Sequence, residues 1–349
     1  MPKSPNWNNP LRNSNNRIVT IGGGTGAPIV IKALILAGFS GISAISTATD
    51  SGGRTGRMRT DERDRIISVG DLLRNLLALI SPAQNHLSRV KAFTELADFT
   101  DGRYRNLGYQ IYYGLLEKYH NNFLAVQKHF EQLLDIRFQG VAIPVTIKPT
   151  NISFSTSIGA VYHGEHELDR QSMSANTITK IWLDEPVPAT PEAISAISQA
   201  TLIIFCPGSI YGSVIVNLLP KGITAALKAS KAKKILITNL VSNRNQTHRF
   251  SPLDYLRLFK KYTGLPRPFD LLLCPGISEA EFDRKYSRVA KIYATEHSHF
   301  LGWAQPELQP LEKLGIKVIR TDAMAITPGL SRIRHDPAKL APLLKSIIL

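Results

Sequence analysis

The segment at residues 17–38, RIVTIGGGTGAPIVIKALILAG, places a short aliphatic run directly before a glycine-rich turn and a helix-like stretch. Residues 18–22 are typical of a buried strand. Pro28 suits the first turn of a helix, where its missing N–H costs nothing, and Gly38 suits the end of that helix. A strand that passes at once into a helix predicts the first unit of a doubly wound α/β sheet.

Further apolar runs repeat this pattern along the chain. GISAISTATDSGG predicts a second parallel strand that ends in a loop, and ATLIIFCPGSIYGSVIVNLL predicts a strand at about 201–205, a turn and a helix. KKILITNL, FDLLLCPG and IKVIRTD are short runs suited to inner strands of a parallel sheet. Together they predict an α/β fold with a mainly parallel, doubly wound sheet and helices on both faces.

The middle of the chain follows a different pattern. Residues 72–135 show helical periodicity, whereas residues 141–183 alternate between apolar and polar and predict a small antiparallel β element. We therefore expect a single domain over 17–349 with an inserted subdomain at about 84–185. The polar, asparagine-rich residues 1–16 predict a disordered tail.

Composition narrows the class of partner and the cellular location. The chain has 42 Lys plus Arg against 27 Asp plus Glu, a formal charge of +15 that favours anionic partners. The basic residues are scattered and lack interleaved aromatic residues, which argues against a nucleic-acid-binding module. Without a leader-like apolar N-terminus or a membrane-length apolar run, we expect a cytoplasmic protein. Its two cysteines are too few for a disulfide framework.

The glycine-rich turn is the first candidate site. Gly22, Gly23, Gly24, Thr25 and Gly26 fit a pattern in which backbone N–H groups face a phosphate at the start of a helix. No Gly-Lys-Ser/Thr follows, so the turn is not a Walker loop. A structural tight turn is the alternative interpretation.

The loop after the second strand is the second candidate. Asp50 falls at the carboxyl edge of the sheet, where ligands of open α/β sheets bind. Gly52 and Gly53, followed by Arg54 and Arg57, suit a loop that grips phosphate. Because acidic residues interleave with the arginines, a solvated and self-paired surface run is the alternative.

Two further groups complete the candidate site. Asp71 in VGDLLRN is either an ordinary helix N-cap or a ligand contact, and Asn75 lies one helical turn later. The turn after the third predicted strand could form a second anion site or a wall that holds a base, and another strand ends at its own polar residue. The residues concerned are Pro207, Gly208, Ser209, Tyr211, Ser213 and Asn239. No Gly-x-Ser-x-Gly motif occurs, and His335 is expected to be structural.

Seven motifs in one order give the sequence a specific resemblance. IVTIGGGTGA, ATDSGGRTGRMR, GDLLRNLLAL, CPGSIYGSVIVNLLPKGI, ITNLVSN, SPLDYLRLF and VIRTD…IRHDPAKLAPLL resemble the gluconeogenesis factor family (YvcK-like), which is related to the 2-phospho-L-lactate transferases (CofD). The likeness covers nearly the whole chain from about Arg17. It implies a Rossmann-like fold with a nucleotide-containing ligand in the cleft.

The resemblance implies two kinds of function. YvcK-like proteins bind UDP-sugars such as UDP-N-acetylglucosamine and are linked to growth on gluconeogenic carbon sources and to cell shape. The transferases use a guanine-nucleotide phospholactate donor and magnesium, and pass phospholactate to a deazaflavin precursor. The matched positions are Gly22–Gly26 for phosphate, Asp50 for the acidic loop, and Pro207–Ser209 with Asn239 for the nucleotide. A homodimer and a protein partner are compatible with the resemblance.

The departures from the family pattern guide the choice between these functions. The usual pair of adjacent acids is here Asp50-Ser51, so one carboxylate is missing from the place where Mg²⁺ would bind. The Gly-His-Ser-x-Gly-Asn signature appears as YRNLGY, which keeps Gly108 and has Tyr109 in place of Asn. We therefore expect a nucleotide-sugar-binding regulator without a catalytic role. The alternatives are an enzyme in which Asp50 and Asp71 hold magnesium, and a protein that docks on nucleic acid or protein through its positive charge.

Overall fold

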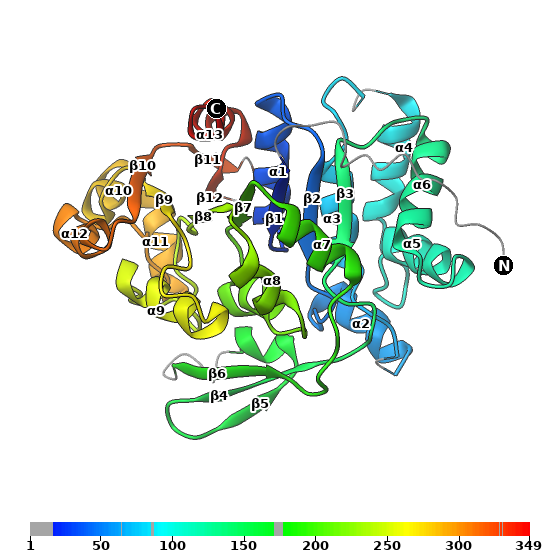
Figure 1. The fold of residues 1–349 in the computed structure, drawn as a ribbon, viewed down its shortest axis with the longest axis horizontal. Helices are drawn as coiled ribbons and strands as arrows, with labels where there is room; N and C mark the ends of the chain where they lie inside the picture. Colours follow the sequence, from blue (N-terminus) through cyan, green and yellow to red (C-terminus); the bar gives the residue numbers. More distant parts are fainter. Residues whose placement is uncertain (1–16, 64, 85–86, 171–176, 328, 330) are drawn as a thin grey trace.

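A seven-stranded parallel sheet forms the centre of the protein (Figure 1), in the order β10-β9-β8-β7-β1-β2-β3. The computed structural model describes residues 17–63, 65–84, 87–170, 177–327, 329 and 331–349, so the predicted tail at 1–16 lies outside the described residues. The strands are β1 (Ile18–Ile21), β2 (Ile42–Ser46), β3 (Gly140–Pro144), β7 (Leu202–Phe205), β8 (Lys233–Ile237), β9 (Leu271–Pro275) and β10 (Lys317–Thr321). The predicted doubly wound α/β fold is confirmed.

The direction of winding reverses between β1 and β7. From β1 the chain moves outward through β2 to β3, and from β7 it moves outward the other way to β10. Right-handed crossovers therefore place the connecting helices on opposite faces of the sheet. One group packs around α1 and consists of α1 (Gly26–Leu36), α3 (Gly70–Ala78) and α13 (Pro337–Ile348). The other consists of α7 (Pro191–Gln199), α8 (Ile223–Ala229), α9 (Pro252–Thr263) and α12 (Gln305–Lys313).

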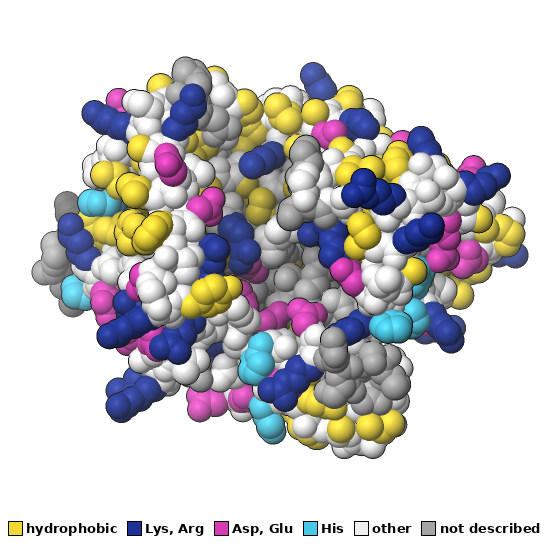
Figure 2. Space-filling view, turned by 180° about the vertical axis from the view of Figure 1, so that it is seen from behind, with side chains coloured by type: hydrophobic (Ala, Val, Ile, Leu, Met, Phe, Trp, Pro, Cys, Tyr) yellow, Lys and Arg dark blue, Asp and Glu magenta, His cyan; other side chains and the backbone are white. Residues whose placement is uncertain are grey.

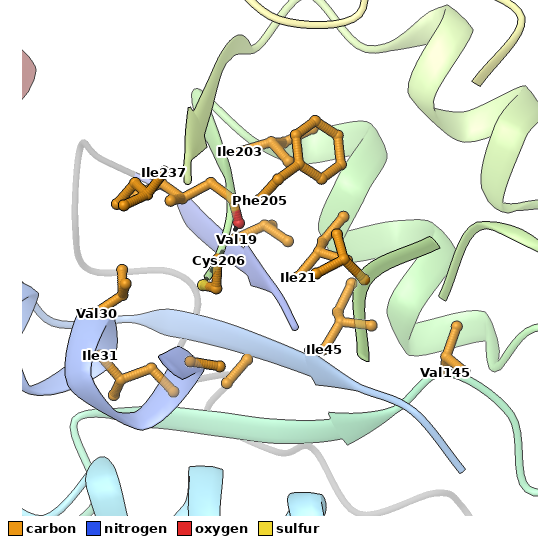
Figure 3. Close-up of a cluster of buried hydrophobic side chains, with 14 of the residues drawn as sticks. Val19, Ile21, Val30, Ile31, Ile45, Val145, Ile203, Phe205, Cys206 and Ile237 are labelled. Carbon is orange, nitrogen blue, oxygen red and sulfur yellow. Dashed lines mark hydrogen bonds between the residues drawn. The ribbon is translucent and has the colours of Figure 1, made fainter. Parts of the chain in front are cut away.

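The core lies on both faces of β1 and β7. Val19 and Ile21 of β1 pack with Ile203 and Phe205 of β7, and Val30 of α1 covers one side (Figure 3). These side chains are almost completely buried. Because aliphatic residues fill both faces, the central strands show continuous apolar runs instead of alternation.

The middle of the chain supplies helices, one sheet strand and a separate small sheet. The helices are α2 (Gly53–Asp61), α4 (Ser88–Asp98), α5 (Leu107–Lys118) and α6 (Phe123–Leu134). The small antiparallel sheet has the order β5-β4-β6, with β4 (Ile152–Thr156), β5 (Val161–His163) and β6 (Ile178–Leu183), and lies below α8 in Figure 1. A short 3₁₀ helix, η2 (Glu165–Asp169), follows β5.

The assignment of residues 141–144 to the antiparallel element is wrong. These residues belong to β3, which pairs in parallel with β2 at the edge of the central sheet. Gly140 allows the close pairing, because a Cβ there would lie 2.0 Å from the carbonyl O of Ile42. Pro144 is tolerated because an edge strand needs no N–H on its outer side. The antiparallel prediction is confirmed for β4, β5 and β6.

The C-terminal part closes the carboxyl edge of β8 and β9. It contains α10 (Glu279–Lys285), α11 (Ser287–Thr295) and a two-stranded antiparallel ribbon of β11 (Met324–Thr327) and β12 (Arg332–His335). His335 is buried, and its Nε2 lies 2.8 Å from the carbonyl O of Thr238 just after β8. Within the described ranges, no helix combines the length and apolarity that crossing a bilayer requires.

Candidate functional site

The glycine-rich turn after β1 packs directly against the loop after β7. Ladder hydrogen bonds continue into both segments, since Gly22 N donates to Ile45 O at 3.1 Å and Cys206 N donates to Ile21 O at 3.0 Å. A Cβ at Gly26 would lie only 2.0 Å from the carbonyl O of Pro207. Gly26 is therefore required for the contact between the two loops, whatever ligand binds there.

A buried carboxylate also needs one of these glycines. A Cβ at Gly23 would lie 1.8 Å from Oδ2 of Asp71, and the Asp71 carboxylate accepts a hydrogen bond from the backbone of Gly24. Gly24 has φ +63°, the left-handed conformation that glycine adopts without strain, and space lies beyond its Cα. Gly23 and Gly26 are therefore required by packing inside the protein, whereas the ligand-binding interpretation stays a prediction for Gly24.

The start of α1 is a weakly capped helix terminus. Within the described part of the chain, the N–H groups of Thr25 and Gly26 donate to no protein acceptor. The helix has no side-chain N-cap and no acidic residue in its first turn. Its partial positive charge is therefore left for an anion to neutralise.

These N–H groups border a cavity of about 810 Å³ at the carboxyl edge of the sheet. Its walls come from the turn after β1, the loops after β7 and β8, the end of α11, and β12. The volume is within the range of small-molecule sites, and the position is the switch point where ligands of doubly wound sheets bind. Figure 2 shows a hollow near the middle of one face, with basic and acidic side chains around it.

Asn239 fixes the loop that faces the glycine turn. Its Oδ1 accepts from Gly208 N at 2.6 Å, and its Nδ2 donates to Gly208 O at 2.7 Å. Both residues line the cavity, as do Pro207, Ser209 and Ser213. The two bonds use the polar atoms of Asn239 within the protein, so this residue orders the wall of the cavity.

Asn239→Ala is expected to weaken nucleotide binding about five- to twentyfold and to lower the free energy of unfolding by about 1–2 kcal/mol, because Gly208 loses two hydrogen bonds. Calorimetric titration and urea unfolding measure these effects. Asn122→Ala, which removes an N-cap bond to Ala125 on the distant helix α6, is the matched control. It should affect stability alone, and equal binding losses in both variants would contradict the role of Asn239.

The helix expected after the Pro-Gly-Ser turn is not an α-helix at its start. Residues Ile210–Val214 form a π-helical turn and Ile215–Leu218 a 3₁₀ turn, and α8 begins only at Ile223. Gln246 stabilises the π-helical turn, because its Oε1 accepts hydrogen bonds from Ser209 Oγ at 2.8 Å and from Tyr211 N at 3.2 Å. Short π segments often occur at functional sites.

Tyr211 points away from the cavity. The residue is 3% exposed, and its hydroxyl donates to the carbonyl O of Ile178 in the small sheet. Ser213 instead stays beside the glycine turn, with Oγ 3.7 Å from the position of a Cβ on Gly24. The structure therefore brings Ser213 to the predicted phosphate site and places Tyr211 in the core.

Asp71, Arg74 and Asn75 support the glycine turn from the other side. Asp71 lies 2.8 Å from a guanidinium nitrogen of Arg74, and Asn75 Nδ2 donates to Gly22 O at 3.3 Å. Burial raises the pKa of Asp71, Arg74 opposes this shift, and the nearby Asp50 adds to it. Asp71 is thus an internal ligand of the turn and not an N-cap, since α3 has no side-chain cap bond.

A second acid, which no sequence motif indicated, lies beside Asp50. Glu165 of η2 extends between the loops after β2 and β7, with Oε1 2.7 Å from the position of a Cβ on Gly212. Burial, and then the charges of Asp50 and Asp169, raise the pKa of Glu165 to about 9, and it shares a hydrogen bond with Asp50. Ser51 binds the same segment, since its Oγ lies 3.0 Å from His166 Nδ1.

Glu165→Gln is expected to remove part of the dependence of stability on pH. Between about pH 4.5 and pH 9 the folded chain keeps a proton on Glu165 that the unfolded chain has lost, so rising pH favours unfolding. Glutamine keeps the shape and cannot ionise. The variant should match the wild type near pH 5 and exceed it by on the order of 1–3 kcal/mol near pH 9. Urea unfolding at both pH values measures this, and a constant difference between the proteins would refute it.

The predicted phosphate-gripping arginines lie outside the cavity. Arg54 is exposed and donates to the carbonyl O of Asp98 at 3.3 Å, and Arg57 forms a 3.2 Å ion pair with Asp61 one turn along α2. The self-paired surface interpretation therefore describes Arg57. Gly52 N donates to Asp50 Oδ1 at 2.9 Å, a local turn that shapes the loop.

The arginines that line the cavity come from segments that were not predicted to be part of the site. Arg244 follows β8, and Arg332 and Arg334 lie on β12. Arg332 is bound by both carboxylate oxygens of Glu296 at the end of α11. The spacing of two residues in RIRH was a signal, because it places both arginines on the same side of a strand.

The side chains that could act as metal ligands limit how a metal ion could bind. Among the residues whose placement the structure describes, no three His, Cys, Asp or Glu side chains gather to form a metal site. Asp50 and Glu165 offer hard carboxylate oxygens next to each other. Mg²⁺ commonly takes one or two carboxylates and completes its shell with phosphate oxygens and water. The residues therefore fit Mg²⁺ only when it arrives together with a phosphorylated ligand.

Comparisons with known proteins agree with this architecture. The family model described as 2-phospho-L-lactate transferase CofD matches residues 18–324. The chain is 28% identical to the gluconeogenesis factor of Listeria innocua over 336 residues, covering 95% of each protein. It is 26% identical to the gluconeogenesis factor of Bacillus subtilis over 338 residues, covering 95% of this chain and 98% of that protein.

The fold is similar to that of a solved structure. A member of the UPF0052 family from Bacillus halodurans superposes with a TM-score of 0.77 at 24% identity, covering 95% of this chain and 99% of that one. The family model spans the chain from β1 to the start of β11. The chain belongs to the 2-phospho-L-lactate transferase CofD family and is similar over nearly its whole length to gluconeogenesis factors.

Proposed function

We propose that this protein is a cytoplasmic, nucleotide-sugar-binding regulator of the gluconeogenesis factor type, linked to carbon metabolism and cell shape. The observation that carries the proposal is the start of α1, whose N–H groups at Thr25 and Gly26 open into a cavity of about 810 Å³. A diphosphate placed there accepts these hydrogen bonds and neutralises the helix terminus. The similarity to proteins named gluconeogenesis factors supports the link to carbon metabolism.

The rest of the ligand extends toward the loops after β7 and β8. The turn at Pro207–Ser209, ordered by Asn239, forms one wall of the cavity, and residues 240–245 form another. Polar backbone and amide groups at these positions suit ribose and base recognition. A homodimer and a protein partner that senses the bound state belong to the same proposal.

Isothermal titration of the full chain with UDP-N-acetylglucosamine, UDP and GDP tests the proposal. We expect saturable binding of at least one nucleotide in the micromolar range, and loss of that binding in Gly26→Ala. Sedimentation velocity of the same samples reports the oligomeric state. If no nucleotide binds at millimolar concentration, the proposed function is wrong.

A magnesium-dependent transferase is the second candidate function. The match to the transferase family and the closeness of Glu165 to Asp50 favour it, because the pair restores two carboxylates where the sequence has lost one acid. Bound Mg²⁺ would stabilise negative charge on a transferred phosphoryl-type group. Asp50 and Glu165 would hold the ion, and Asp71 would hold the glycine turn.

The two candidates differ in their response to Asp50→Ala. Given a guanine-nucleotide phospholactate donor and a deazaflavin precursor as acceptor, a transferase is expected to pass phospholactate to the acceptor and release the guanine nucleotide in a magnesium-dependent way, and Asp50→Ala should abolish this turnover. A regulator is expected to bind nucleotide without turnover. Product analysis by anion-exchange chromatography distinguishes them.

A further inference from the structure

One wall of the cavity carries more positive charge than the protein itself neutralises. Arg244, Arg332 and Arg334 line this wall together with the carboxylates of Glu296 and Asp169. Glu296 is used by Arg332, which also lies 5.3 Å from the ring centroid of Tyr293. Arg332 is therefore fixed in place and its charge is matched.

Arg244 and Arg334 are the two arginines of this wall that form no ion pair among the described residues. Arg244 is partly exposed and, within the described part of the chain, its guanidinium forms no hydrogen bond or ion pair. It lines the same cavity as the Arg332–Glu296 pair, and it adds to the lowering of the pKa of Glu296 that the hydrogen bond from Arg332 mainly causes. Arg334 is exposed two residues along β12 from Arg332 and adds a further charge.

The loop that carries Arg244 is held firmly on both sides of this residue. Asn243 Nδ2 donates to Asp169 Oδ1 at 3.2 Å, and Asn245 Nδ2 donates to the carbonyl oxygens of Leu168 and Arg170 at 2.9 and 2.8 Å. Asn245 N also donates to Asn243 Oδ1 at 2.9 Å. Because the residues on both sides are anchored, binding of an anion has to order only the side chain of Arg244 and not the loop that carries it.

Two separate sets of anion-binding groups therefore border one cavity. The start of α1 offers backbone N–H groups, and another part of the cavity lining offers full guanidinium charges. Resting on the proposed function, we propose that the ligand carries a carboxylate beyond its diphosphate, and that Arg244, assisted by Arg334, binds this carboxylate. A carboxylate is favoured because Arg332 already holds one, that of Glu296, through both nitrogens of its fork on the same wall.

Paired titrations of the full chain with UDP-glucose and UDP-glucuronate test this inference. The two ligands share the nucleotide and the ring, and differ only in a hydroxymethyl group or a carboxylate at C6. We expect UDP-glucuronate to bind about tenfold more tightly, the size of one charge-assisted hydrogen-bonded contact. Arg244→Gln should remove this preference while keeping the binding of UDP-glucose, and Arg244→Lys should keep part of it.

Arg257→Gln is the control variant, because Arg257 is exposed on α9 and pairs at 3.0 Å with Asp254, outside the cavity. It should keep the full preference for UDP-glucuronate. Equal affinity for the two ligands in the wild type overturns the carboxylate subsite and leaves the proposed function intact. Equal losses for both ligands in Arg244→Gln would assign Arg244 to the diphosphate and also overturn it. Absence of binding by either ligand overturns both proposals.

Discussion

Gly26→Ala is expected to weaken nucleotide binding at least about a hundredfold, because the new methyl group has no space. Its Cβ would lie 2.0 Å from the carbonyl O and 2.6 Å from the carbonyl C of Pro207. Both are backbone atoms in the loop after β7, so the two loops must separate and the wall of the cavity must move. Overpacking of this kind costs about 1–3 kcal/mol of unfolding free energy.

Titration and urea unfolding of Gly26→Ala should be compared with those of Gly114→Ala. Gly114 lies within α5, and a Cβ there meets no atom within 4 Å. Alanine at this position should leave binding unchanged and raise stability by up to about 1 kcal/mol through helix propensity. Wild-type affinity in Gly26→Ala would show that the contact with Pro207 does not shape the site.

Arg59→Leu is expected to lower the free energy of unfolding by about 3–5 kcal/mol. Arg59 is 1% exposed, and its guanidinium donates to the carbonyl oxygens of Thr49 and Thr150 at 3.1 Å and to Asn151 Oδ1 at 2.7 Å. It thereby joins the end of β2 to the segment that enters the small sheet. Leucine leaves these buried acceptors without donors.

Arg57→Gln is the matched control for Arg59→Leu. Arg57 lies on the same helix, its side chain is 46% exposed, and its ion pair with Asp61 is worth about 0.5 kcal/mol or less. Arg59→Lys should fall between the two, because an ammonium group keeps the charge and loses the planar fork. Chemical unfolding of the three variants measures these effects, and a loss below about 1 kcal/mol in Arg59→Leu would contradict the role of Arg59.

The central sheet was predictable because local pattern and tertiary environment agree. The runs that became β1, β7 and β9 are almost entirely apolar and buried along their whole length, as strands covered on both faces must be. β3 was misplaced because its polar neighbours gave it the alternation of an antiparallel strand. Only the close contact between Gly140 and Ile42 reveals its partner, and that contact is absent from local sequence.

The sequence predicted those parts of the candidate site that a single segment forms. It did not predict the parts that several distant segments form together. The turn at Gly22–Gly26 and the loop at Pro207–Ser209 follow strands that end at the switch point, so their meeting follows from topology. The sequence of α2 could not show which of its arginines are buried and which are exposed. Arg59 turns inward on α2 while Arg57 faces solvent, and sequence spacing alone does not tell them apart.

The residues missed were those brought in by long-range packing. Glu165 reaches Asp50 from 115 positions away in the sequence, through the docking of η2 on Ser51. Arg244 lies on the loop after β8 and Arg334 on β12, and both line the cavity together with the end of α11. In each case a side chain with an ordinary local pattern acquires its role from the elements that face it.

A crystal structure of the full chain with a bound UDP-sugar tests the central claim most directly. We predict that oxygens of the diphosphate lie within hydrogen-bond distance of the N–H groups of Thr25 and Gly26, with the nucleoside along the loop ordered by Asn239. A nucleotide whose phosphates bind elsewhere, with these N–H groups satisfied by the protein itself, would contradict the account.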